Sequence, residues 1–262
     1  MPALSNSGGR MQWIFLSPHL DDAALSCGGL IAERTRKGDP VEIWTICAGD
    51  PPPGPLPAFA QSLHKRWGTR RAAAATRRLE DQQSCQRLGA VARHFAIPDC
   101  IYRRIPLTGN PLISTNEDLF QPFPDSQRSL VDSLRDQLAN ALPLKAQIVC
   151  PLALGNHIDH QLVRRVAEQL DRPLLYYADY PYTVQASNDL AQSIHPDWQT
   201  FTQAISPSGL RAWQAAVAAH SSQISTFWDS VSEMEVAIQS YYEAGGGCKL
   251  WRDRNAKTIT NL

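Results

Sequence analysis

Two short segments of the sequence hold side chains that are suited to bind a metal ion. The first, SPHLDDAALSCGG, places His19, Asp21 and Asp22 within four residues of one another. The second, GNHIDH, places His157 and His160 three residues apart. Imidazole nitrogens and carboxylate oxygens are common ligands of Zn²⁺ in proteins. The chain therefore offers the donors of a metal site from two segments that lie far apart in the sequence.

The number and type of these donors indicate a catalytic site rather than a structural one. One His and one Asp from the first segment, with one His from the second, make three protein ligands and leave a fourth tetrahedral position for water. Two imidazoles favour zinc over magnesium, although Fe²⁺ or Co²⁺ accepts the same set. Zinc lowers the pKa of its bound water to roughly 7, so we expect a hydrolase that uses a zinc-activated water.

Each segment taken alone also fits an ordinary structural role. Asp21 or Asp22 could cap a helix while His19 stays in a surface turn. A His-x-x-His spacing such as that of residues 157–160 is also typical of a hydrophilic loop that leads into a helix. Both segments, however, follow an apolar strand pattern and precede a helix pattern, where open α/β sheets bind their ligands. The matching positions favour a single shared cleft.

Strand and helix patterns alternate for most of the chain. This alternation predicts an α/β, Rossmann-like three-layer fold with a mostly parallel sheet. The C-terminal part is expected to be helical, over residues 208–223 and 230–244, before a last short segment at 249–253. The expected strands are 12–17, 41–47, 93–97, 147–152 and 174–178, and the expected helices between them are 20–37, 69–88, 126–142 and 161–170.

Three further segments carry weaker signals. Residues 49–68 are rich in proline and are expected to form a long loop, which could cover an active site. Gly28 and Gly29 fall inside the first expected helix, where small residues allow close packing on the sheet. Residues 1–10 lack the apolar centre of a secretory signal and are expected to be a flexible leader.

Composition limits the classes of partner. The chain has 25 Lys and Arg residues and 25 Asp and Glu residues, so it has no excess of basic residues that would indicate nucleic-acid binding. No apolar run reaches the roughly 18 residues of a membrane span. The six cysteines are scattered singly without a CxxC pair, which is typical of reduced thiols in a cytoplasmic protein. We expect residues 1–262 to form one domain that acts on a small molecule, while its oligomeric state, including a homo-oligomer, is left open.

The two segments resemble the marks of the LmbE-like or PIG-L-like zinc-dependent N-deacetylases. That family has a His-x-Asp-Asp segment at the end of a strand and a downstream His-x-Asp-His segment. The resemblance implies one zinc held by His19, Asp22 and His160, with Asp21 as the general base. It also implies that His157 stabilises the oxyanion or protonates the leaving group.

The match to the family covers most of the chain in architecture but is not complete. Leu20 and Ala23 stand where the family usually has a proline and an acidic residue, and neither position is a metal ligand. Glu80 with the following Leu88-Gly89, and HSSQ at 220–223, also look like family features. The departures mark a subgroup of the family.

By resemblance the substrate is an N-acetylated amino sugar or a glycoconjugate that carries one, from which the enzyme removes the acetyl group. The candidate substrate contacts are Arg70, Asn156, Tyr180 and His220, with Trp67 and Tyr182 as further aromatic faces for a sugar ring.

Other functions compete with this interpretation. The same metal centre could serve an amidase that acts on a larger acyl group or on a thiol conjugate. A sugar-binding protein with a residual metal site is the alternative of another class, but the presence of Asp21, which is not needed as a ligand, argues against it. A Rossmann-type redox enzyme lacks support, because no GxGxxG follows the first strand.

Overall fold

The computed structural model describes residues 10–69, 72–185 and 187–253 of the chain, so that all but the last residue of the leader expected at 1–10 lies outside the described residues. Its strands are β1 (Trp13–Ser17), β2 (Val41–Thr45), β3 (Val91–His94), β4 (Gln147–Pro151), β5 (Leu174–Tyr177), β6 (Gln199–Thr202) and β7 (Lys249–Arg252). They form one sheet in the order β3-β2-β1-β4-β5-β7-β6. The strands from β3 to β5 are parallel, β7 is antiparallel to β5, and β6 is antiparallel to β7.

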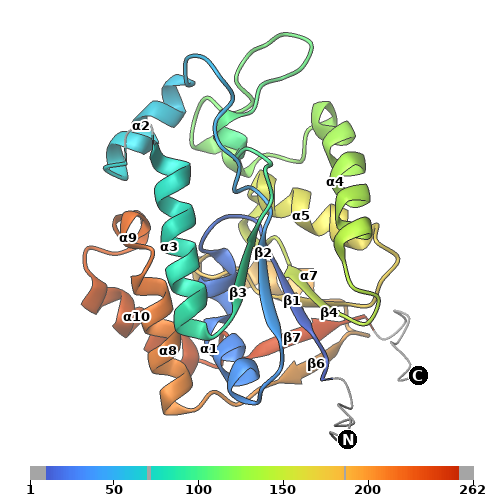
Figure 1. The fold of residues 1–262 in the computed structure, drawn as a ribbon, viewed down its shortest axis with the longest axis vertical. Coiled ribbons are helices and arrows are strands. Elements are labelled where there is room, and N and C mark those ends of the chain that lie inside the picture. The colour runs from blue at the N-terminus through green and yellow to red at the C-terminus, as the bar shows by residue number, and fades with distance from the viewer. Residues whose placement is uncertain (1–9, 70–71, 186, 254–262) are drawn as a thin grey trace, which may run out of the picture.

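Helices cover both faces of this sheet, as the sequence pattern predicted. The helices are α1 (Asp22–Arg36), α2 (Ala58–Arg66), α3 (Ala73–Leu88), α4 (Arg128–Ala141), α5 (Ile158–Glu168), α6 (Tyr182–Gln185), α7 (Ser187–Ser193), α8 (Pro207–Ala218), α9 (Ser221–Phe227) and α10 (Val231–Glu243). Helices α1, α3 and α8 pack together on one side, with α4 and α5 on the other (Figure 1). The expected three-layer α/β fold is confirmed.

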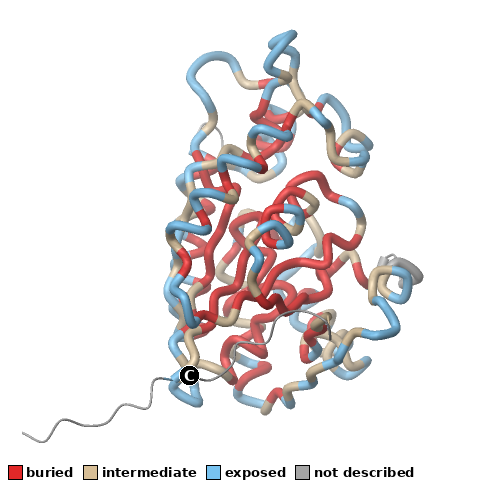
Figure 2. Tube along the Cα trace, turned by 90° about the vertical axis from the view of Figure 1, so that its right-hand side faces the viewer, coloured by how far each residue is buried: buried red, intermediate tan, exposed pale blue. Residues whose placement is uncertain are grey.

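Alternate residues of the central strand β1 explain why both faces are covered. Ile14 and Leu16 belong to the core beneath α4 and α5, whereas Phe15 belongs to the core beneath α1, α3 and α8. Side chains of a strand point alternately to the two faces of a sheet, so an apolar run without alternation requires cover on both. Figure 2 shows the result, with the buried segments gathered in the middle of the molecule.

The contact between α1 and α8 is unusually close at two glycines. A Cβ atom added to Gly28 would lie 2.3 Å from Cδ1 of Trp213, and one added to Gly29 would lie 2.6 Å from Cδ1 of Ile205. Trp213 is fully buried and donates from Nε1 to the Leu25 carbonyl at 3.1 Å. The two glycines thus make room for α8 and its preceding loop, and the expectation that they pack on the sheet is wrong.

Several boundaries differ from those expected. The proline-rich segment 49–68 is not all loop, because it contains α2. The single helix expected at 208–223 is interrupted between α8 and α9. The C-terminal part also contributes two antiparallel strands, of which β6 was not expected. Strand β3 begins two residues before its predicted start and ends at His94.

The described part of the chain contains no helix that is both long and apolar enough to span a bilayer. All six cysteines are buried and free, which confirms the expected reduced thiols. No disulfide framework contributes to this fold.

Candidate metal centre

The two predicted segments meet at the carboxyl ends of the neighbouring parallel strands β1 and β4. His19, Asp21 and Asp22 follow β1 at the start of α1. His157 and His160 follow β4 at the start of α5. Because β1 and β4 pair in parallel, their ends lie at the same edge of the sheet, as the sequence predicted.

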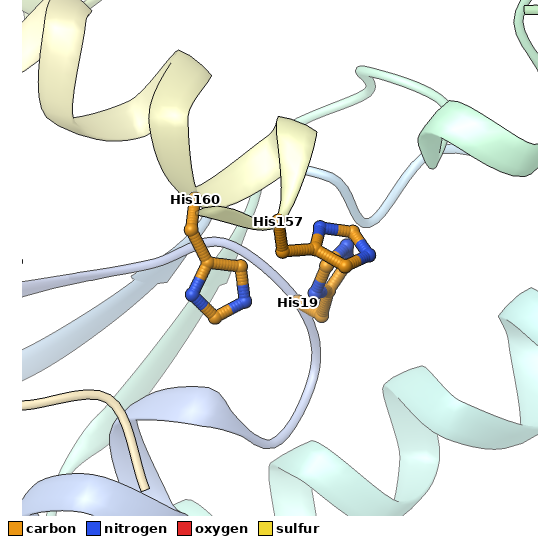
Figure 3. A group of neighbouring side chains, drawn as sticks. All are labelled: His19, His157 and His160. Carbon is orange, nitrogen blue, oxygen red and sulfur yellow. The ribbon is translucent and has the colours of Figure 1, made fainter. Parts of the chain in front are cut away.

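Figure 3 shows His19, His157 and His160 turned toward one another from the two segments. One ring nitrogen from each of the three lies within 4.8 Å of the others. Asp22 completes the group, since its Oδ2 atom lies 3.1 Å from Nδ1 of His19 and 3.3 Å from Nε2 of His160. All four side chains are buried. The protein therefore places one carboxylate oxygen between two imidazole nitrogens.

Each of these two imidazoles uses its other nitrogen to contact a buried carboxylate. Nδ1 of His160 lies 2.6 Å from Oδ1 of Asp179, and Nε2 of His19 lies 3.0 Å from Oδ2 of Asp159. Nε2 of His160 is buried and makes no hydrogen bond within the described residues, because the nearby Asp22 oxygen is not aligned to accept one. A carboxylate behind a metal-binding histidine fixes its tautomer and orientation. This donor set fits a zinc ion.

Asp159 is itself held by a positive charge. Its carboxylate pairs with Arg103 and accepts a hydrogen bond from the Cys100 backbone N–H at 2.9 Å. Burial alone would raise the pKa of Asp159, but Arg103 and His19 outweigh burial and hold the pKa well below its ordinary value. Asp159 therefore stays ionised as an acceptor for His19.

The carboxylates raise the proton affinity of the metal-free imidazoles. Burial alone would lower the pKa of His160, but Asp22 and Asp179 outweigh it and raise the pKa to about 9. Asp99 and Asp22 likewise hold the pKa of His19 well above its ordinary value despite burial. Burial would raise the pKa of Asp22, yet the two imidazoles hold it well below. A divalent cation would bind here in place of the protons on these two imidazoles.

Asp21 lies beside this group and contacts a different partner. Although it occupies the N-cap position of α1, its side chain makes no capping hydrogen bond. Its Oδ1 atom instead accepts from Nη2 of Arg77 at 3.3 Å. Burial raises the pKa of Asp21 in spite of the Arg77 charge. The side chain of Asp21 is thus not used for helix capping, which was the main alternative for this residue.

His157 has a defined tautomer because it caps a helix. Its Nδ1 atom accepts a hydrogen bond from the Asp159 backbone N–H at 3.2 Å, at the N-cap of α5. Burial, together with the neighbouring His19 and His160, holds the pKa of His157 well below its ordinary value, so the ring is neutral. A neutral ring that accepts at Nδ1 carries its proton on Nε2. His157 is a hydrogen-bond donor even without a positive charge.

The group opens into a cavity of about 280 Å³. Helix α2, the 3₁₀ helix at Glu117–Phe120 and helix α9 contribute its walls. Besides His19, Asp22 and His157, the apolar lining residues are Leu63, Trp67, Ile101, Leu119, Phe120, Tyr182 and Phe227, and the polar and charged ones are Asp21, Arg66, Arg77, Asp99, Asn116, Gln223 and Thr226.

Among the candidate substrate contacts, Trp67 and Tyr182 line the cavity, whereas Asn156, Tyr180 and His220 do not. Arg70 lies outside the described residues. Asn156 is exposed, Tyr180 is buried with its ring 4.3 Å from that of Tyr241, and His220 is buried without a hydrogen bond to either ring nitrogen. The structure does not bring Asn156, Tyr180 or His220 to the wall of the cavity.

Sequence reasoning assigned no role to four charged residues around the site. Asp179 follows β5, a third strand end at the same edge of the sheet, so its position was a usable signal. Oδ2 of Asp99 lies 3.8 Å from Nε2 of His19, within the distance of an ion pair. Arg77 and Arg103 carry no local signal, because only the tertiary fold brings a helix residue and a loop residue to the carboxylates.

The sequence and the fold of this chain are similar to those of known deacetylases. The family model described as "PIG-L: GlcNAc-PI de-N-acetylase" matches residues 14–170. A 2'-N-acetylparomamine deacetylase from Niallia circulans is 30% identical over 197 residues, which are 67% of this chain and 69% of that relative.

Solved structures of deacetylases are similar to this chain over a longer stretch of its length. The zinc-inhibited form of teicoplanin deacetylase is similar with a TM-score of 0.77 and 27% identity, over 94% of this chain and all of that one. A deacetylase–teicoplanin complex is similar with a TM-score of 0.76 and 26% identity, over 92% of this chain and 97% of that one.

Proposed function

The chain belongs to the PIG-L family, and on that premise we propose that it hydrolyses the acetamide of an N-acetylated amino sugar or of a glycoconjugate that carries one. It is an N-deacetylase, as its relatives are. The observation that carries the proposal is the buried Nε2 of His160, which makes no hydrogen bond to any residue that the structure describes and faces the same carboxylate oxygen as His19.

We assign one zinc ion per chain to His19, Asp22 and His160. Nε2 of His19 and Nδ1 of His160 contact Asp159 and Asp179, whereas Nδ1 of His19 and Nε2 of His160 both face Oδ2 of Asp22 and are the nitrogens we assign to the metal. When bound, zinc supplies a Lewis acid that polarises a carbonyl and makes water acidic near neutral pH. Fe²⁺ or Co²⁺ would fit the same donors.

Asp21 is the proposed general base. It adjoins Asp22 in sequence but contacts Arg77 rather than either imidazole, so its carboxylate remains available beside the metal ligands. The Arg77 contact also fixes the orientation of the carboxylate. Asp21 would take a proton from the attacking water and return it to the departing nitrogen, which an amide needs because an amine leaves poorly without protonation.

His157 is the proposed donor to the developing negative charge. Its neutral ring carries the proton on Nε2, and its helix-capping contact fixes that tautomer. A preorganised donor aimed at an oxyanion is most effective in a site from which water is excluded. Protonation of the ring is not required for this role.

The walls of the cavity suit a sugar. Trp67 and Phe227 offer aromatic faces, while Asn116 and Gln223 offer amide groups near them. Sugar rings present apolar faces together with hydroxyl groups, so both types of contact are useful.

We also propose that the enzyme acts in the cytoplasm, because its six cysteines are free. We further propose that residues 1–262 form one domain.

A panel of N-acyl compounds tests this function. Zinc-loaded protein is assayed for amine release from N-acetylglucosamine, N-acetylated pseudodisaccharides, N-acetyl amino acids, longer N-acyl sugars and N-acylated thiol conjugates. We expect release from the acetylated sugars, with loss of activity on chelation and recovery on adding zinc. Release only from longer acyl chains or from thiol conjugates would favour the alternative amidase, and release from none would contradict the proposal.

A further inference from the structure

Glu80 anchors a short helix that forms one wall of the cavity. This glutamate lies on α3 and is buried. Its Oε1 atom accepts from Ser221 Oγ and from the Ser222 backbone N–H, both at 2.8 Å, and its Oε2 atom accepts from Ser222 Oγ at 2.7 Å. His220, at the N-cap of α9, makes no side-chain capping bond. Glu80 therefore supplies the cap of α9 from a different helix.

The same hydrogen bonds continue to a residue of the cavity wall. Nε2 of Gln223 donates to Ser222 Oγ at 2.9 Å, and Gln223 lines the cavity beside the metal ligands. Gln223 is buried, and its Oε1 atom accepts no hydrogen bond from the described residues. The chain of contacts thus runs from Glu80 through Ser222 to Gln223.

The chemistry of the three groups fixes the direction of every hydrogen bond in this chain. An ionised carboxylate only accepts, so the single hydroxyl proton of Ser222 is given to Glu80. Ser222 Oγ can then only accept from Gln223, which requires that the NH₂ end of the amide faces Ser222. The opposite end, the carbonyl oxygen, is the one left for another partner. The orientation of the Gln223 amide is set by the charge on Glu80.

From this order we propose that Gln223 is a substrate-binding residue whose carbonyl oxygen accepts a hydrogen bond from a hydroxyl or N–H group of the substrate. Glu80 and Ser222 are its positioning residues. The inference rests on the proposed function, because it assumes that an acetylated sugar occupies the cavity. It adds a specificity rule: the enzyme prefers substrates that place a donor opposite Gln223.

The first test compares three substitutions. Gln223→Met keeps the length of the side chain but removes both amide groups, and we expect KM to rise about tenfold at unchanged kcat and zinc content. Glu80→Gln keeps the shape of the anchor but can donate to Ser222, which frees the amide of Gln223 to turn, so we expect a smaller rise in KM. Gln83→Met, an exposed glutamine on the same helix as Glu80, is the matched control and should behave as wild type.

Deoxy substrates locate the partner group. The 3-, 4- and 6-deoxy forms of N-acetylglucosamine are compared with the parent sugar in wild type and in Gln223→Met. We expect one deoxy form to raise KM about tenfold in wild type and to make no difference in the variant. If each deoxy form changes KM equally in the wild type and in Gln223→Met, Gln223 does not accept a hydrogen bond from a substrate hydroxyl.

The orientation is tested without a substrate. In ¹⁵N-labelled, zinc-loaded protein, one side-chain N–H of Gln223 should exchange slowly with solvent, and Ser222→Ala should abolish that protection while leaving the backbone spectrum of α1 unchanged. Equal exchange in both proteins would overturn the inference. Wild-type protein that releases no amine from any sugar would contradict the proposed function, whereas an active wild type with an unchanged KM in Gln223→Met would contradict only the inference.

Discussion

Nδ1 of His160 lies 2.6 Å from Oδ1 of Asp179, and this contact decides which nitrogen of the ring can reach a metal. The proton of the neutral imidazole lies between His160 and Asp179, so Nε2 keeps its lone pair. Asp179 also accepts from the Leu154 backbone N–H at 3.0 Å, which ties the carboxylate to the loop after β4. A residue after β5 thus orients His160, the proposed metal ligand that follows β4.

Asp179→Asn should weaken zinc binding without removing a ligand. The amide keeps the size of the side chain but loses the negative charge that fixes the His160 tautomer, so we expect affinity to fall by about 10- to 100-fold. Competition with a fluorescent chelator measures the change. Asp125→Asn, at an exposed ion pair, is the control. Unchanged zinc affinity in Asp179→Asn would show that the contact does not act on the metal.

Zinc affinity should rise with pH. Because the pKa of metal-free His160 is about 9, its ring is protonated at neutral pH, and zinc must displace that proton to bind. Below the pKa, the apparent affinity for zinc rises about tenfold per pH unit for each proton that zinc displaces. Calorimetry between pH 6.5 and 8.5, in buffers of different ionisation enthalpy, counts the protons released. Binding that is independent of pH would contradict the geometry of the site.

The buried thiols should be unreactive in the folded protein. Burial raises the pKa of Cys27 and of Cys150 well above the ordinary value, and the other four cysteines are also buried. A thiol reagent at pH 8 should therefore label none of them rapidly in native protein and all six after denaturation. Rapid labelling of a thiol in native protein would mean that its helix or strand opens readily.

Gly28→Ala should destabilise the fold. The added methyl group would meet the ring of Trp213 at 2.3 Å, and α8, which carries this ring, also packs against α3. We expect a loss of about 1 to 3 kcal/mol in the free energy of unfolding, measured by urea denaturation. If the ring is the cause, the cost should shrink when Gly28→Ala is combined with Trp213→Leu, since contacting residues are not additive.

Much of the site was predictable because metal-binding groups follow strand ends. His19 and His160 lie far apart in the chain, but the alternation of strands and helices was enough to place β1 and β4 at one edge. The same reasoning extends to Asp179 after β5. It does not extend to Arg77, whose contact with Asp21 depends on how α3 packs and leaves no trace in the local sequence.

The errors in the predicted fold also have physical causes. Strand β6 reads QTFT, a mostly polar edge segment with no apolar pattern to reveal it. The helix expected at 208–223 was continuous in its pattern, yet the chain turns between α8 and α9, where the carboxylate of Glu80 accepts the amide of Ser222. That long-range hydrogen bond outweighs local helix propensity.

The most direct test of the account compares Asp21→Asn with Asp22→Asn in activity and zinc content, on the acetylated sugar that wild-type protein hydrolyses. We expect Asp21→Asn to keep about one zinc per chain while its kcat falls by about 10²- to 10⁴-fold, because only the proton transfer is lost. Asp22→Asn should lose zinc and activity together. Wild-type activity in Asp21→Asn, or undiminished zinc in Asp22→Asn, would contradict the division of roles between the two neighbouring carboxylates.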